Sequence, residues 1–264
     1  MKRVFAPAAA LLVLFTLIGC AGVSSSKPTM SIFMADAPLT GVTSVMITID
    51  RVEANCDGDW IEIDVTQRMY DLLTLTQVDT LIGTATVPPG NYSQIRLFIS
   101  KVTVEDETGT HDVIVPSGAK SGLKLNVNAA VGGSGDVAIL LDFNVAKSLV
   151  KQGNGQYLLK PVIPAVLRQS VGSVRGLVLY EGYREEAVLV TATYIEGDSY
   201  PIGTEVNTSA TIADGTFKIW ALLEGVYRID LMQTLDGEPV YFGMVDSVIV
   251  VAQQVTDLGG IDLD

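Results

Sequence analysis

Apolar and polar residues alternate along most of the chain after residue 30, in short runs that turn residues interrupt. In the clearest run, residues 42–52, Val45, Ile47 and Ile49 fall on one side of an extended chain. A period of two residues indicates strands that bury one face. The same pattern predicts further strands at residues 31–34, 60–65, 93–100, 102–104, 113–115, 123–127, 137–143, 157–167, 174–179, 187–194, 207–212, 216–219, 228–232 and 241–251.

Turn and cap residues divide these runs. Asp57-Gly58-Asp59 and Asp214-Gly215 are typical of hairpin turns, and Asn144 is a suitable N-cap for a short helix over residues 145–150. Residues 70–82 fit either a short helix or an irregular crossover. Strands spaced by about 8–12 residues, with Gly and Asp turns between them, favour a sandwich.

We therefore expect an all-β protein with two β-sandwich domains in tandem, at residues 30–168 and 173–264. The boundary is expected in the polar stretch Gln169-Ser170-Val171-Gly172-Ser173, where the charge balance also changes. Residues 21–172 hold 11 basic and 15 acidic side chains (net −4), whereas residues 173–264 hold 4 and 15 (net −11).

The first 20 residues have the pattern of an export signal. Lys2 and Arg3 give a positive start, and residues 4–19 are uncharged and mostly apolar. That length suits a secretion signal and is short for a membrane-spanning helix, which needs about 20 apolar residues. The end of the run, Leu17-Ile18-Gly19-Cys20, resembles the lipobox of bacterial lipoproteins.

This resemblance implies that residues 1–19 are cleaved and that Cys20 becomes an acylated first residue, followed by a polar tether over residues 20–29. Several acyl chains hold a protein firmly at a membrane. Ala21 follows the cysteine where an aspartate would resemble an inner-membrane retention signal, which favours the outer membrane of the cell envelope. Whether the protein faces the periplasm or the outside stays open. The alternative is an ordinary signal peptide with an incidental cysteine.

Composition limits the partners. Without Lys2 and Arg3, 15 basic residues face 30 acidic ones, so the mature chain carries a formal charge of 15 − 30 = −15. Such a chain is poorly suited to bind nucleic acid through its own surface. Apart from Cys20, Cys56 is the only cysteine, so we expect no internal disulfide and a fold that depends on its core. The carboxylates beside Cys56 argue against a reactive thiol.

Four stretches of the first domain resemble a family called domain of unknown function 4382. They are ADAPLTGVTSVMITIDRVE (35–53), VPPGNYSQIRLFI (87–99), VPSGAKSGLKL (115–125) and LLDFNVAKSLVKQGNGQYLLKPVI (140–163). The resemblance spans nearly all of residues 30–167. It implies an envelope-associated β-domain, often on lipoproteins, with no established activity.

The second domain resembles the carboxypeptidase-regulatory-like, or transthyretin-like, sandwich. The matching stretches are Gly176-Leu177-Val178, Val190-Thr191-Ala192, Asp214-Gly215-Thr216-Phe217 and Leu223-Glu224-Gly225-Val226-Tyr227. This broad group shares its fold with some carbohydrate-binding modules, and a shared fold does not fix a function. The long loop over residues 196–205 departs from the compact pattern.

Catalytic chemistry has little support in the sequence. His111 is the only histidine, no G-x-S-x-G elbow is present, and His/Cys metal ligands are lacking. We therefore expect no enzyme, no cofactor and no metal site of that type, with His111 solvated at a strand end and Glu105-Asp106-Glu107 at a solvated loop tip. Calcium binding stays open, because oxygen ligands abound, although the EF-hand spacing is missing.

Two possible sites stay open. Asp142, Lys124 and Lys160 interrupt apolar strands and would form a charged cluster if those strands met; otherwise the lysines occupy solvent positions and Asp142 a strand end. The aromatic residues Trp60, Tyr92, Trp220 and Tyr241 could stack on a sugar ring or pack in the core.

The expected function is accordingly that of a lipid-anchored envelope protein with a structural or protein-interaction role. The alternative is a carbohydrate-binding lipoprotein that recognises polysaccharide through its second domain. The expected partners are the membrane, through Cys20, and an unidentified envelope protein or polysaccharide.

Overall fold

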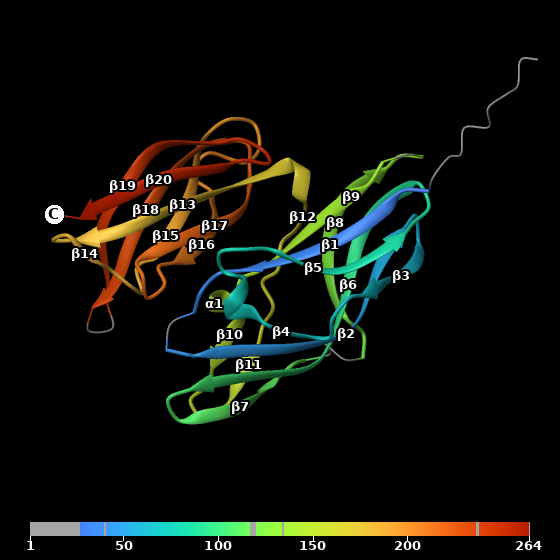
Figure 1. Ribbon diagram of the computed structural model, residues 1–264, viewed down its shortest axis with the longest axis horizontal. Helices are drawn as coiled ribbons and strands as arrows, with labels where there is room; N and C mark the ends of the chain where they lie inside the picture. Colours follow the sequence, from blue (N-terminus) through green and yellow to red (C-terminus); the bar gives the residue numbers. More distant parts are fainter. Residues whose placement is uncertain (1–26, 40, 117–119, 134, 236–237, 264) are drawn as a thin grey trace, which may run out of the picture.

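The computed structural model describes residues 27–39, 41–116, 120–133, 135–235 and 238–263, which form an all-β protein (Figure 1). The predicted signal segment and Cys20 lie outside the described residues. The strands up to residue 167 share one hydrogen-bonded sheet, here called the first sandwich. They are β1 (Thr29–Asp36), β2 (Ser44–Cys56), β3 (Asp59–Val65), β4 (Met69–Asp71), β5 (Thr80–Thr86), β6 (Gly90–Asp106), β7 (Gly109–Ile114), β8 (Leu123–Val131), β9 (Val137–Phe143), β10 (Leu149–Lys151), β11 (Tyr157–Leu159) and β12 (Ala165–Leu167).

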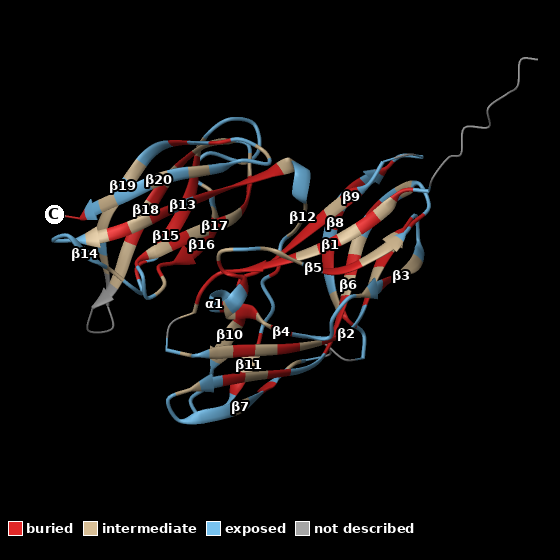
Figure 2. Cartoon of the chain, viewed as in Figure 1, coloured by how far each residue is buried: buried red, intermediate tan, exposed pale blue. Residues whose placement is uncertain are grey.

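This sheet curves around a single core. Its order is β10-β11-β7-β6-β2-β3-β5-β1-β9-β12, with β8 paired to β6 and β4 to β2. Strands far apart in this order, such as β6 and β9, contribute Leu97 and Leu141 to the same buried cluster. The inward residues of β2, Val45, Ile47 and Ile49, are completely buried, as the alternating pattern predicts. Figure 2 shows the same alternation of buried and exposed positions along the strands.

The second sandwich comprises two four-stranded sheets that enclose their own core. One sheet contains β13 (Val171–Tyr180), β14 (Tyr183–Arg184), β17 (Thr216–Leu223) and β20 (Val255–Leu263). The other has the order β16 (Glu205–Ala210), β15 (Leu189–Glu196), β18 (Gly225–Leu235) and β19 (Glu238–Val250). Tyr194 and Tyr227 meet edge to face between them, with ring centroids 5.3 Å apart.

The structure confirms most predicted strands and corrects several boundaries. The undecided segment at residues 70–82 becomes β4, the short 3-10 helix η1 (Leu72–Leu75) and the start of β5. The single strand predicted at residues 157–167 is two strands, because Pro161 and Pro164 lie between them and cannot donate to a ladder. The predicted boundary at residues 169–173 contains no linker: the 3-10 helix η2 (Arg168–Ser170) leads directly into β13.

The two predicted hairpin turns have different outcomes. Asp57 and Gly58, both with positive φ, join β2 to β3 as a hairpin. Asp214-Gly215 also turns the chain, but β16 pairs with β15 and β17 pairs with β13. The predicted second hairpin is therefore wrong, because a turn fixes the local direction of the backbone and not the partner of each strand.

The short helix predicted over residues 145–150 is present as α1 (Val145–Ser148) but ends two residues early, because Leu149 and Val150 pair in β10. The Oδ1 of Asn144 accepts a hydrogen bond from the backbone N–H of Lys147 at 3.0 Å, which makes Asn144 the N-cap. Across the ranges that the structure describes, no helix is both long and apolar enough to span a bilayer.

Candidate functional site

The charged cluster that Asp142, Lys124 and Lys160 could have formed does not exist. Lys124 and Lys160 are exposed to solvent on the first sandwich. Asp142, in contrast, is only 1% exposed and points into the junction between the two sandwiches. The lysines therefore hold the solvent positions that alternation predicts, and Asp142 finds other partners.

An apolar cluster forms one part of this junction. Ala35 and Leu140 of the first sandwich pack with Val171 and Ala221 of the second. Trp220 adds a hydrogen bond, from its Nε1 to the backbone oxygen of Thr76 at 3.0 Å. Strands β1, β9, β13 and β17 thus share a small core of their own, which couples the two units.

Amide side chains form the polar part of the junction. Asn207 donates from Nδ2 to Oδ2 of Asp142 and to the backbone oxygen of Trp220. Because Asn144 uses its Oδ1 to cap α1, its Nδ2 is left to donate to Oγ1 of Thr208 at 3.2 Å. Asp142 and Asn144 of the first sandwich therefore pair with Asn207 and Thr208 of the second across the boundary.

Two carboxyl groups are buried beside each other in this region. The parallel pairing of β1 and β9 puts Asp36 opposite Phe143 and Ala35 opposite Asp142. Burial raises the pKa of Asp142 to about 6, against the hydrogen bond from Asn207, which lowers it. Burial also raises the pKa of Asp36 well above its usual value, although the N–H of Val145 donates to its Oδ1 at 2.9 Å. The other oxygen, Oδ2 of Asp36, is buried with no hydrogen-bond partner among the described residues.

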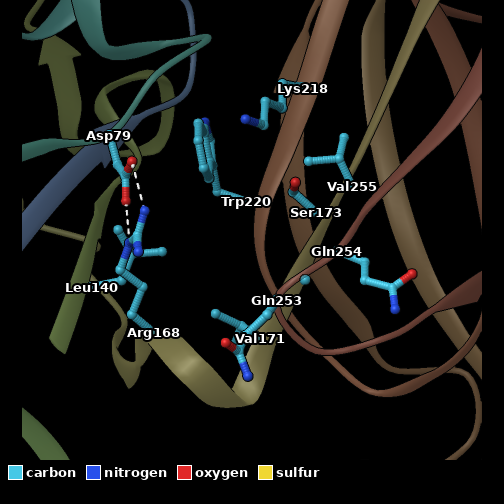
Figure 3. A pocket seen from close by; sticks show the side chains of 11 residues that line it. Asp79, Leu140, Arg168, Val171, Ser173, Lys218, Trp220, Gln253, Gln254 and Val255 are labelled. Atoms are coloured by element: carbon cyan, nitrogen blue, oxygen red, sulfur yellow. Dashed lines mark hydrogen bonds and ion pairs between the residues drawn. The ribbon is translucent and has the colours of Figure 1, made fainter. Parts of the chain in front are cut away.

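A cavity of about 300 Å³ opens beside the junction (Figure 3). Asp79 and Arg168 lie on one side, where Arg168 donates from Nε and a terminal nitrogen to the two carboxylate oxygens at 2.5 and 3.2 Å. Lys218 and Ser173 lie on the side formed by the second sandwich, and Trp220 stands between the two sides. The cavity is therefore built from both sandwiches.

Lys218 is half-buried at this cavity. Its Nζ lies 3.4 Å from the centroid of the Trp220 ring and donates to the backbone oxygen of Gln77 at 3.2 Å. Burial lowers the pKa of Lys218 to about 8; Asp79 opposes that shift, whereas Arg175 and Arg168 add to it. No carboxylate of the described residues comes within 4.0 Å of this ammonium group.

His111 belongs to a hydrogen-bonded cluster around the Asp106 carboxylate rather than to a solvated strand end. Its Nε2 lies 2.9 Å from Oδ1 of Asp106. The other oxygen of Asp106 accepts from the Tyr157 hydroxyl at 2.8 Å and from Nζ of Lys151 at 3.2 Å. The expected solvated loop tip is therefore held against β11, because these donors surround the Asp106 carboxylate.

The four aromatic residues considered for sugar stacking are scattered. Tyr92 is buried in the core, Trp60 lies under the guanidinium of Arg96 at 3.6 Å, and Trp220 belongs to the junction. Of these four residues, only Tyr241, on the second sandwich, is largely exposed. Cys56 is buried and free, at the end of β2. In the described ranges, no three His, Cys, Asp or Glu side chains gather as a metal site would require.

An exposed aromatic surface of the second sandwich lies at the end of β13 that is remote from the junction. Tyr180 pairs with Tyr183 across strands, and its ring stacks on Phe242 with centroids 6.0 Å apart and planes 9° apart. Tyr183 is 75% exposed. We call these three residues the distal aromatic group; no sequence pattern marks them, because the three lie on three different strands.

The model of the family described as "Domain of unknown function (DUF4382)" matches residues 27–161. A search of curated protein sequences finds no relative. Among solved structures, a 9R-lipoxygenase from Cyanothece PCC8801 is 12% identical, with 44% of this chain and 19% of that chain covered at a TM-score of 0.24. A leucine-rich repeat protein from Bacteroides thetaiotaomicron is 11% identical, with 90% and 26% covered at 0.25. The major pilin subunit BcpA of Bacillus cereus is 12% identical, with 89% and 69% covered at 0.26.

This chain thus spans about a quarter or less of the first two structures. The family match is different in kind, because residues 27–161 are just over half of the 264-residue sequence. The chain belongs to the DUF4382 family.

Proposed function

We propose that this is a lipid-anchored protein of the cell envelope, attached through acylated Cys20, with a structural or protein-interaction role. The observation that carries the proposal is the direction of two strands. β1 begins at Thr29 and ends at the junction, where Ala35 packs. β13 begins at the junction with Val171 and ends at Tyr180.

The start of β1 and the β13–β14 hairpin therefore lie at opposite ends of the protein, as Figure 1 shows. Strands of 8 and 10 residues, at about 3.3 Å per residue, span roughly 25 and 30 Å. An anchor before Thr29 would hold the first sandwich near the membrane and present the second one beyond it. The packed and hydrogen-bonded junction supports a fixed orientation between the two.

Replacing Cys20 with serine should release the protein from membranes, because serine offers no thiol to acylate. Cells expressing the full chain are fractionated, and the protein is followed in the membrane and soluble fractions with a labelled fatty acid. The matched control is Cys56→Ser, which should stay membrane-bound and labelled, because Cys56 is a buried core residue. Label on the Cys20→Ser protein would contradict the anchor. Ala21 supports the outer membrane, which separation of the two membranes would test.

The distal aromatic group favours a second candidate function, polysaccharide binding by the second sandwich. Exposed rings can stack on the apolar face of a sugar, and no core-packing role accounts for a Tyr183 ring that is 75% exposed. Tyr183→Ala should weaken retention of the protein in gels that contain an envelope polysaccharide. Trp60→Ala, on the first sandwich, should leave retention unchanged. Equal retention of wild type and Tyr183→Ala would argue for a protein partner instead.

A further inference from the structure

The cavity beside the junction has hydrogen-bond donors that no protein group uses. Ser173 is only 4% exposed, and its hydroxyl has no hydrogen-bond partner among the described residues, although its backbone N–H donates to Gln254. Lys218 uses one of its three N–H groups on the backbone oxygen of Gln77. The Ser173 hydroxyl is not among the fully buried unpaired atoms of the described residues, so it reaches open space in the cavity, where a ligand that accepts hydrogen bonds could pair with it and with Nζ of Lys218.

The charges of the cavity are also unbalanced. Arg168 is neutralised by Asp79 in a two-point ion pair, which leaves the Lys218 ammonium as the remaining charge of the lining. A net positive cavity is unusual in a mature chain with 15 basic and 30 acidic residues. A ligand that neutralises the cavity would place a single negative charge close to Nζ of Lys218.

The remaining wall is apolar. Leu140, Val171 and Val255 line the cavity together with the indole of Trp220. Its volume of about 300 Å³ is at the lower end of ligand pockets, which run from about 300 to 1,000 Å³. A ligand that fills it must therefore be small, with an apolar face as well as acceptors. Gln253, which also lines the cavity, lies in the turn between β19 and β20 and has a φ of 62°, which non-glycine residues rarely adopt.

We propose that this cavity binds a hydroxylated carboxylate of monosaccharide size, a hexuronate, with the carboxylate at Lys218 and a hydroxyl group at Ser173. The apolar wall contacts the C–H face of the ring. The site joins both sandwiches, so a bound acid also holds them together. It is separate from the distal aromatic group and does not depend on lipid attachment.

The test uses intrinsic fluorescence of the full chain in detergent, in a Trp60→Phe background that leaves Trp220 as the single tryptophan. Titration with glucuronate should give a saturable change, and neutral glucose should give none. Lys218→Met should weaken glucuronate binding about tenfold or more, since hydrogen bonds to charged groups contribute about 1.5–3 kcal/mol. Lys218→Arg keeps the charge and should retain most of the binding. Lys124→Met is the matched control, because Lys124 is an exposed lysine of the first sandwich, and it should bind as the background does.

A second readout is the pH dependence. Because the pKa of Lys218 is lowered to about 8, with Asp79, Arg168 and Arg175 as the charged groups that face it, glucuronate affinity should fall between about pH 7 and pH 9. An equal response to glucose overturns the proposal, as does an unchanged curve in Lys218→Met protein whose circular dichroism is native. Binding of acetate at the same concentrations as glucuronate would overturn the choice of a hydroxylated ligand.

Discussion

Replacement of Asp142 with asparagine should remove a large part of the pH dependence of stability and make the protein more stable at neutral pH. The folded-state pKa of Asp142 is about 6, against an ordinary value of 3.8, so the folded protein binds more protons than the unfolded chain between these values. Stability therefore falls as the pH rises through this window, by about 3 kcal/mol at about 1.4 kcal/mol per pKa unit. Asparagine resembles the protonated acid and can still accept the bond from Asn207.

Urea unfolding of wild type and Asp142→Asn at about pH 4 and about pH 7.5 would measure this effect. The free energies of unfolding of the two proteins should differ little at the lower pH, and Asp142→Asn should be about 3 kcal/mol more stable at the higher pH. Asp112→Asn is the control, since that carboxylate is 85% exposed and should leave the pH profile of the wild type unchanged. Parallel profiles for wild type and Asp142→Asn would contradict the buried acid. Asp36 is present in both proteins. Because burial raises its pKa as well, it contributes a further loss of stability as the pH rises.

Gly225→Ala should destabilise the second sandwich by about 3–5 kcal/mol. Gly225 has a φ of 152°, where a side chain is strained, and an added Cβ would lie 2.3 Å from Cε2 of Tyr194 and 3.0 Å from the backbone oxygen of Glu196. Tyr194 cannot retreat, because it is completely buried between Tyr200 and Tyr227. Backbone strain of about 1–3 kcal/mol and overpacking of about 1–3 kcal/mol add in the same direction.

The matched control for Gly225→Ala is Gly153→Ala. Gly153 has no heavy atom within 4 Å of an added Cβ and no positive φ. The stability of the Gly153→Ala protein should therefore stay within about 0.5 kcal/mol of wild type. The stability of both variants is measured by urea unfolding, which is monitored through the near-ultraviolet signals of the tyrosines. A Gly225→Ala protein within about 1 kcal/mol of wild type would show that the β17–β18 turn tolerates a side chain.

Alternation was a good guide to individual strands and a poor guide to their partners. The faces of β2 and β6 follow directly from the sequence, because a period of two assigns every second residue to the core. The parallel pairs β1–β9 and β13–β20 join segments far apart in the chain, and no turn signal marks them. β5 and β20 are also missing from the prediction; their outward and inward residues do not separate cleanly into polar and apolar.

The candidate site was harder to predict than the fold. Asn144 could be assigned as a helix cap from its neighbours, whereas its contact with Thr208 depends on residues 64 positions away. Asp142 was visible as a charged residue in an apolar strand, whereas Lys218 was not singled out; only the packing of the two sandwiches decides that Asp142 is buried and that Lys218 lines a cavity. Cys20, by contrast, depends on local sequence alone.

The placement of β1 has a mechanical consequence. If the chain is tethered before Thr29 and a partner pulls on the remote end of the second sandwich, tension runs along the length of β1. This strand is hydrogen-bonded on both sides, to β5 and to β9, over nearly its whole length. The antiparallel bonds to β5 lie across the strand and the parallel bonds to β9 are slanted to it, so a load along β1 strains both ladders together instead of opening their bonds one by one. The first sandwich is thus built to resist extension by force at the point where an anchor would transmit it.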